Sequence, residues 1–215
     1  MNISIEETKR TLITKTLLIT TLLLTILQVV LSVASLPWDA FYFIVRLLPI
    51  LMTGFILLKY KSIINGTNYK RQLALPIMLV LVTQIIVLLE TVKGLSFYSE
   101  NPILYSFTTW EYICLYALNC GPSIIAITTV IIASILCLLR KQKNILSSIF
   151  MGISAVVQLV DGVALLIRGA EIYVRQFGMV YVLFLALSTL VNVLVFITFS
   201  VLMLPTKAED APPSC

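Results

Sequence analysis

Two charged side chains, Arg46 and Asp161, lie well inside long apolar segments of the sequence. A lone charge in the hydrocarbon core of a membrane is costly, whereas a guanidinium group and a carboxylate satisfy each other when they pair. We therefore predict an ion pair between Arg46 and Asp161, with Glu90 as the reserve partner for Arg46. Glu90 also stands three positions before Lys93, and pairing between these two near the interface is the alternative.

Amide side chains recur at a similar depth on other apolar segments. At a rise of about 1.5 Å per helical residue, Gln28 and Asn119 lie about 10 Å below the outer ends of their segments. Gln84 and Gln158 lie a few ångströms deeper, and Asn192 is near the middle of its segment. The sequence therefore predicts a polar layer in the outer third of a membrane, centred on the charged pair.

Helical periodicity predicts an inward position for these polar groups. In the first apolar segment the polar residues follow steps of three, four or seven and share one face: Thr14, Thr21, Thr25, Gln28, Ser32 and Ser35. The fifth segment repeats this pattern with Ser147, Ser154, Gln158, Asp161 and Arg168. A kink that frees backbone carbonyl groups at a similar depth is predicted in the fourth segment by Asn119-Cys120-Gly121-Pro122.

Two functions are compatible with such a layer. In a small transporter-like or ligand-binding bundle, Asp161 would be the ion or proton site, Arg46 its counter-charge, and the amides would line a cavity for a small solute or ion. In a membrane interaction or regulatory subunit, the same polar groups would only hold helices together, and the partner would be another membrane protein. A hydrated cavity open to the outer surface favours the first function, and a closed, fully bonded layer favours the second.

Several chemistries are disfavoured by the residue inventory. The chain has no histidine, which removes His-based acid–base relays, histidine-held haem and the commonest zinc motifs. The other aspartates, Asp39 and Asp210, lie outside the apolar segments, and the four cysteines form no C-x-x-C pair. No phosphate-binding loop or dinucleotide fingerprint is present. We expect no enzymatic activity, no cofactor and no metal site.

The composition predicts an all-α polytopic membrane bundle. Of the 215 residues, 60% are hydrophobic and 12% charged, whereas soluble domains have roughly 45–50% apolar and about 25% charged residues. A helix needs about 20 apolar residues to cross the hydrocarbon core. Six such segments form a single domain over 1–205, with spans at about 12–35, 40–58, 73–92, 112–139, 145–167 and 179–204. Residues 206–215 are predicted to be a short disordered tail.

The distribution of lysine and arginine predicts the orientation. Most of the fifteen basic residues lie before the first span, after the second and fourth spans, and in the tail. Basic loops stay in the cytoplasm, so both termini are expected there, in a protein of the cell membrane. The same clustering disfavours nucleic-acid binding. The alternative for the first segment is a signal peptide, because its apolar run ends in Val33-Ala34-Ser35, and its removal would leave five spans.

Overall fold

The described part of the chain is entirely helical apart from short turns, which confirms the all-α prediction. The computed structural model describes residues 2–35, 48, 50–59, 69–100, 108–139 and 145–204. Its long helices are α1 (Asn2–Ser35), α3 (Tyr69–Glu100), α4 (Thr109–Leu139), α5 (Ile145–Phe177) and α6 (Met179–Met203). A shorter helix covers Ile50–Lys59. The predicted tail at 206–215 lies outside the described residues.

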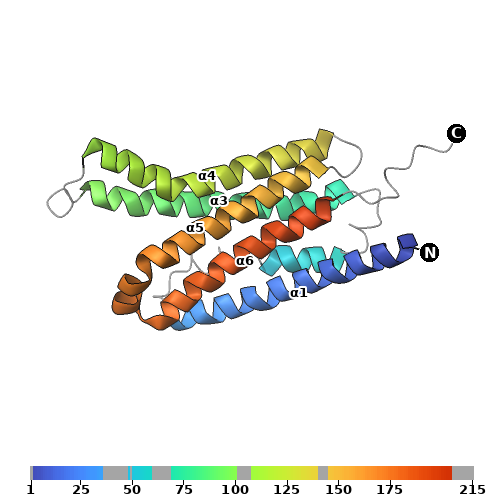
Figure 1. Ribbon diagram of the computed structural model, residues 1–215, viewed down its shortest axis with the longest axis horizontal. Coiled ribbons are helices and arrows are strands. Elements are labelled where there is room, and N and C mark those ends of the chain that lie inside the picture. The colour runs from blue at the N-terminus through green and yellow to red at the C-terminus, as the bar shows by residue number, and fades with distance from the viewer. Residues whose placement is uncertain are drawn as a thin grey trace.

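Four of the helices are long and apolar enough to cross a membrane, which makes the chain an integral membrane protein. These candidate spans are Thr11–Leu31, Ile113–Leu136, Ile145–Ile167 and Met179–Met203. The segments expected as the second and third spans contain shorter apolar helices, Ile50–Lys59 and Leu73–Leu89. The six-span prediction is therefore confirmed in part. The start of α1 and the end of α6 lie at the same end of the bundle, as an even number of crossings requires (Figure 1).

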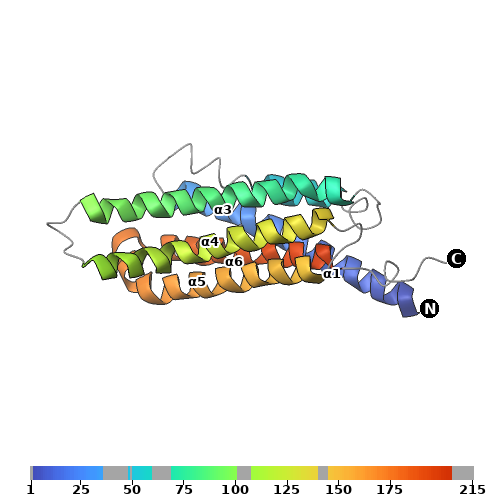
Figure 2. The same cartoon turned by 90° about the horizontal axis from the view of Figure 1, so that it is seen from above.

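Helix α6 is the centre of the packing. It contacts α5 on one side and α1 on another, while α4 lies against both α5 and α3 (Figures 1 and 2). Its mean hydropathy of 2.5 is the highest among the candidate spans, as expected for a helix with neighbours on several sides. Its largest buried side chains are Phe196 and Phe199, each 1% exposed. Leucine, isoleucine and valine side chains cover the exposed faces of the outer helices, as lipid contact requires.

The described side chains of the polar face predicted for α1, from Thr14 to Gln28, are buried. Thr14, Thr21 and Thr25 are at most 1% exposed, and the apolar Leu18 completes the same face. Two of the hydroxyl groups donate to the carbonyl four residues earlier: Thr21 to Leu17 at 2.7 Å and Thr25 to Thr21 at 2.6 Å. Because these hydroxyls are satisfied within their own helix, they allow close packing without a partner on another helix.

Helices α5 and α6 lie close together at Gly162. A Cβ atom at this position would overlap the Thr189 side chain, whose own Cβ would be only 2.7 Å away. The contact at Gly152 is looser, because a Cβ atom added there would lie 3.7 Å from Ser200 Oγ on α6. The two helices are joined at Gly178, whose φ of 83° lies in the left-handed region that favours glycine. The pair therefore forms a tightly packed hairpin.

Helix α4 begins with a reciprocal cap just outside its candidate span. The backbone N–H and hydroxyl of Thr108 both donate to Glu111 Oε2, at 2.6 and 2.8 Å. The backbone N–H of Glu111 in turn donates to Thr108 Oγ1 at 3.3 Å. This is the capping-box arrangement, which satisfies two donors that the first helical turn leaves unpaired. The Thr-x-x-Glu spacing was available in the sequence as a start signal.

Acidification is expected to loosen the first turn of α4. The backbone N–H of Thr108, and then its hydroxyl, hold the pKa of Glu111 below the ordinary value of 4.5. Because the folded-state pKa is lowered, the cap is fully stabilising above the unfolded value and is lost as the pH falls through the lowered pKa. A carboxyl NMR titration should show Glu111 titrating below 4.5, and Thr108→Ala should raise its midpoint part of the way back. An unchanged midpoint in the variant would mean that the hydroxyl does not hold the carboxylate.

Candidate functional site

The charged residues of the predicted layer are described only in part. Arg46 lies outside the described residues, so the Arg46–Asp161 pair stays a prediction. Asp161 is half-buried on α5, six residues before the end of the candidate span Ile145–Ile167. Glu90 lies in α3, but its side chain is outside the described set.

The structure brings together two of the predicted amides, Gln84 and Gln158. Gln158 Nε2 on α5 donates to Gln84 Oε1 on α3 at 3.3 Å. Gln84 is only 3% exposed. An amide pair in a membrane interior satisfies polar atoms that lipid cannot, so this bond connects α3 to α5 across the bundle.

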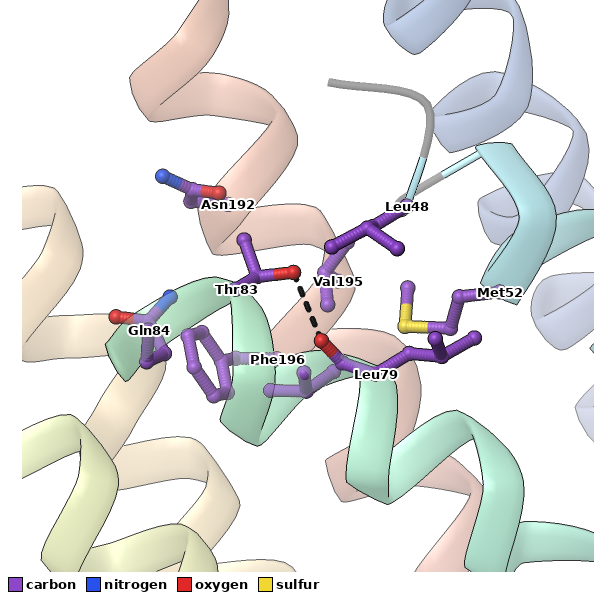
Figure 3. Close-up of a pocket in the computed structure, with 9 residues that line it drawn as sticks. Leu48, Met52, Leu79, Thr83, Gln84, Asn192, Val195 and Phe196 are labelled. Atoms are coloured by element: carbon purple, nitrogen blue, oxygen red, sulfur yellow. Dashed lines mark hydrogen bonds between the residues drawn. The ribbon is translucent and has the colours of Figure 1, made fainter. Parts of the chain in front are cut away.

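A small pocket lies beside this amide pair, between the helix Ile50–Lys59, α3 and α6 (Figure 3). Its volume is about 10 Å³, the lower limit of the space that one water molecule needs. The polar side chains in its wall are Thr83, Gln84 and Asn192. The apolar remainder of the wall comprises Leu48, Met52, Leu79, Val80, Val195 and Phe196.

Asn119 and Gln28 lie away from this pocket. The Asn119 side chain is exposed, and its Nδ2 donates to the carbonyl of Leu115 at 2.7 Å. Gln28 is 8% exposed on the buried face of α1, which packs against α6. Neither residue is among those that line the pocket.

The exposure of Asn119 shows where α4 loses its covering neighbours. Helical spacing places Asn119 on the same face as Ser123, Ala126 and Val130. Ser123 is 5% exposed, and Ala126 and Val130 are both 0% exposed. The face is therefore buried at each of these three positions, which follow Asn119 along α4. In Figure 1, α3 and α4 diverge from α5 and α6 toward the end where α4 begins. This face of α4 is therefore buried toward the end of the helix and only partly covered toward its start, where Asn119 is exposed and Leu115 and Tyr116 are half-buried.

Hydroxyl pairs join the helices in the half of the bundle that contains the end of α4. Thr129 on α4 and Ser154 on α5 share a short, buried hydrogen bond. Ser148 on α5 donates to the carbonyl of Ser200 on α6 at 2.7 Å, and Ser200 donates to the carbonyl of Ser148 at 2.8 Å. Beside them, the buried hydroxyl of Ser147 has no hydrogen-bond partner in the described ranges. Ser154 lies on the predicted polar face of α5, whereas its partner Thr129 and the Ser148–Ser200 pair follow from no spacing within a single helix.

The chemistry that this site offers is neutral hydrogen bonding, with Asp161 as a charged group one turn beyond Gln158. In the described ranges, no group of three or more histidine, cysteine or acidic residues is arranged to hold a metal ion. Cys114 and Cys120 are free thiols. The chain matches no protein-family model, and the searches of curated proteins and of solved structures also gave no match.

Proposed function

We propose that this protein is a small transporter-like or ligand-binding membrane bundle that receives a polar solute or ion from the outer side. The proposal includes six spans, cytoplasmic termini, a place in the cell membrane and no catalytic activity. The observation that carries it is the change from buried to exposed along one face of α4, between Ser123 and Asn119. A face that carries an amide and loses its cover only at its outer end suits a cleft that opens outward.

The distribution of hydrogen bonds supports an outward-open arrangement. The inner half is held by Thr129–Ser154 and by the two bonds between Ser148 and Ser200. A polar solute that reached this level would have to break bonds that have no replacement in lipid. The outer half offers Asn119, the half-buried Asp161 and, deeper, the Gln84–Gln158 pair. In the proposal these groups bind the solute and the hydroxyl pairs form the inner seal.

A second function is favoured by the size of the interior space. The pocket of about 10 Å³ beside Gln84 has no room for a solute larger than water. The threonine hydroxyls of α1, α3 and α4 mostly bond to their own helices, as packing residues do. An interaction or regulatory subunit of a larger membrane assembly is therefore the alternative, with the amide pair serving only to join α3 to α5.

Water access to α4 distinguishes the two functions. In a background without the four native cysteines, Asn119→Cys is expected to react with a membrane-impermeant, positively charged thiol reagent added to the outside of intact cells. The depth-matched control is Ala117→Cys, because Ala117 is exposed on the opposite, lipid-facing side of α4. A thiol reacts as its thiolate, which a lipid environment suppresses, so we expect position 119 to react at least about tenfold faster.

The remaining outcomes contradict the proposed cleft. Equal reaction at positions 117 and 119 would place this part of α4 above the membrane rather than in a cleft. No reaction at either position would mean that lipid covers both faces. Ser123→Cys, on the same face but buried, is expected to stay unreactive and marks the floor of the cleft.

A further inference from the structure

Asn192 lies near the middle of the candidate span Met179–Met203. Asn192 is thirteen residues from Met179 and eleven from Met203, or about 20 Å and about 17 Å from the two ends of α6. Lipid offers an amide no hydrogen bonds at this depth, so an amide retained here needs a partner inside the protein.

The walls of the pocket leave the Asn192 amide without such a partner. Figure 3 draws one hydrogen bond among the nine pocket residues, from Thr83 Oγ1 to the carbonyl of Leu79 at 2.8 Å. Asn192 and Gln84 lie on the same side of the pocket, opposite Met52, but are not bonded to each other. Gln84 Oε1 accepts from Gln158, which leaves the two N–H groups of Gln84 Nε2 available as donors.

The pocket has the size and the polar groups that hold one water molecule. A buried water needs about 10–15 Å³ and two to four polar partners. The volume here is about 10 Å³, and Asn192, Gln84 and the lone pairs of Thr83 Oγ1 supply both donors and acceptors. We propose that a single water molecule binds between Asn192 and Gln84 as a permanent part of the fold.

This water site connects three helices. The water would join Asn192 on α6 to Gln84 on α3, and Gln84 is already bonded to Gln158 on α5. The resulting chain of hydrogen bonds crosses the bundle at the depth where lipid offers none. The inference does not depend on the proposed function, because a transporter and an interaction subunit would both need this amide to be satisfied.

Removing the Asn192 amide gives opposite results for a hydrated and an empty pocket. If the water is present, Asn192→Leu displaces it and leaves Gln84 with unpaired donors, so the variant should unfold at a lower denaturant concentration in detergent micelles. If the pocket is empty, the same change removes an unsatisfied amide and fills space, so the midpoint should stay equal or rise. A lowered midpoint supports the site, and an equal or raised midpoint overturns it.

Two further variants separate a bound water from simple packing damage. Asn192→Gln places an amide one methylene group further into the pocket, where it can bond to Gln84 directly. It should therefore recover most of the unfolding midpoint that Asn192→Leu loses. In a Gln84→Leu background, Asn192→Leu should lower the unfolding midpoint much less than it does in the native protein. The reason is that the water has already lost Gln84 as a hydrogen-bond partner. Additive losses in the double variant would overturn the bridging role. Asn119→Leu, which removes an exposed amide outside the pocket, is the control and should leave the midpoint nearly unchanged.

Discussion

Replacing Gly162 by alanine is expected to destabilise the bundle by about 1–3 kcal/mol. The added Cβ would overlap the Thr189 side chain on α6, and the Thr189 Cβ would be 2.7 Å away. Thr189 has little freedom to withdraw, because its hydroxyl donates to the carbonyl of Leu185 at 3.1 Å. The two helices must therefore separate, which disturbs the hairpin that contains the central helix α6. The measurement is the free energy of unfolding in detergent micelles, followed by helical circular dichroism.

Matched glycines distinguish this clash from a general effect of the substitution. A Cβ at Gly121 or Gly54 would meet nothing within 4 Å, so alanine there should be neutral or should stabilise the helix by up to about 1 kcal/mol. Combining Gly162→Ala with Thr189→Gly moves the small residue from α5 to α6 and should recover much of the loss. If Gly162→Ala behaves like Gly121→Ala, the close approach of α5 and α6 described here is incorrect.

The parts of the fold that depend on one helix could be predicted from the sequence. The buried polar face of α1 follows from the spacing of Thr14, Thr21 and Thr25, because helical periodicity alone determines which residues share a face. The candidate spans follow in the same way from the length and apolar content of each segment. These properties are local, and no neighbour has to be known to derive them.

The parts that depend on neighbouring helices could not be predicted in this way. Periodicity places Asn119 on the same face of α4 as Ser123 and Ala126, but no pattern within α4 predicts that Asn119 is exposed while those two residues are buried. The contact between Gly162 and Thr189 depends on the register between α5 and α6, which no pattern within either helix encodes. The pairing of Gln84 with Gln158 was compatible with their depths, but depth alone does not select a partner.

If Arg46 and Asp161 form the predicted ion pair, a charge reversal at either position is expected to cost about 3–5 kcal/mol, since it leaves the remaining charge without its partner inside the membrane. Arg46→Asp places two carboxylates together, and Asp161→Arg places two guanidinium groups together. The double variant restores one charge of each sign and should recover much of the folded fraction, measured as monodisperse protein extracted from membranes. The effect should be large because lipid cannot solvate the isolated charge.

The identity of the partner is decided by a second exchange. If Glu90 rather than Asp161 pairs with Arg46, then Arg46→Asp should be rescued by Glu90→Arg and not by Asp161→Arg. The conservative changes Asp161→Asn and Arg46→Gln remove charge without reversing it, so each should cost less than the corresponding reversal. If both double variants lose as much folded protein as the sum of their single variants, Arg46 has neither partner. The half-buried Asp161 would then be held by other groups, and the polar layer would have to be assigned without a charged pair at its centre.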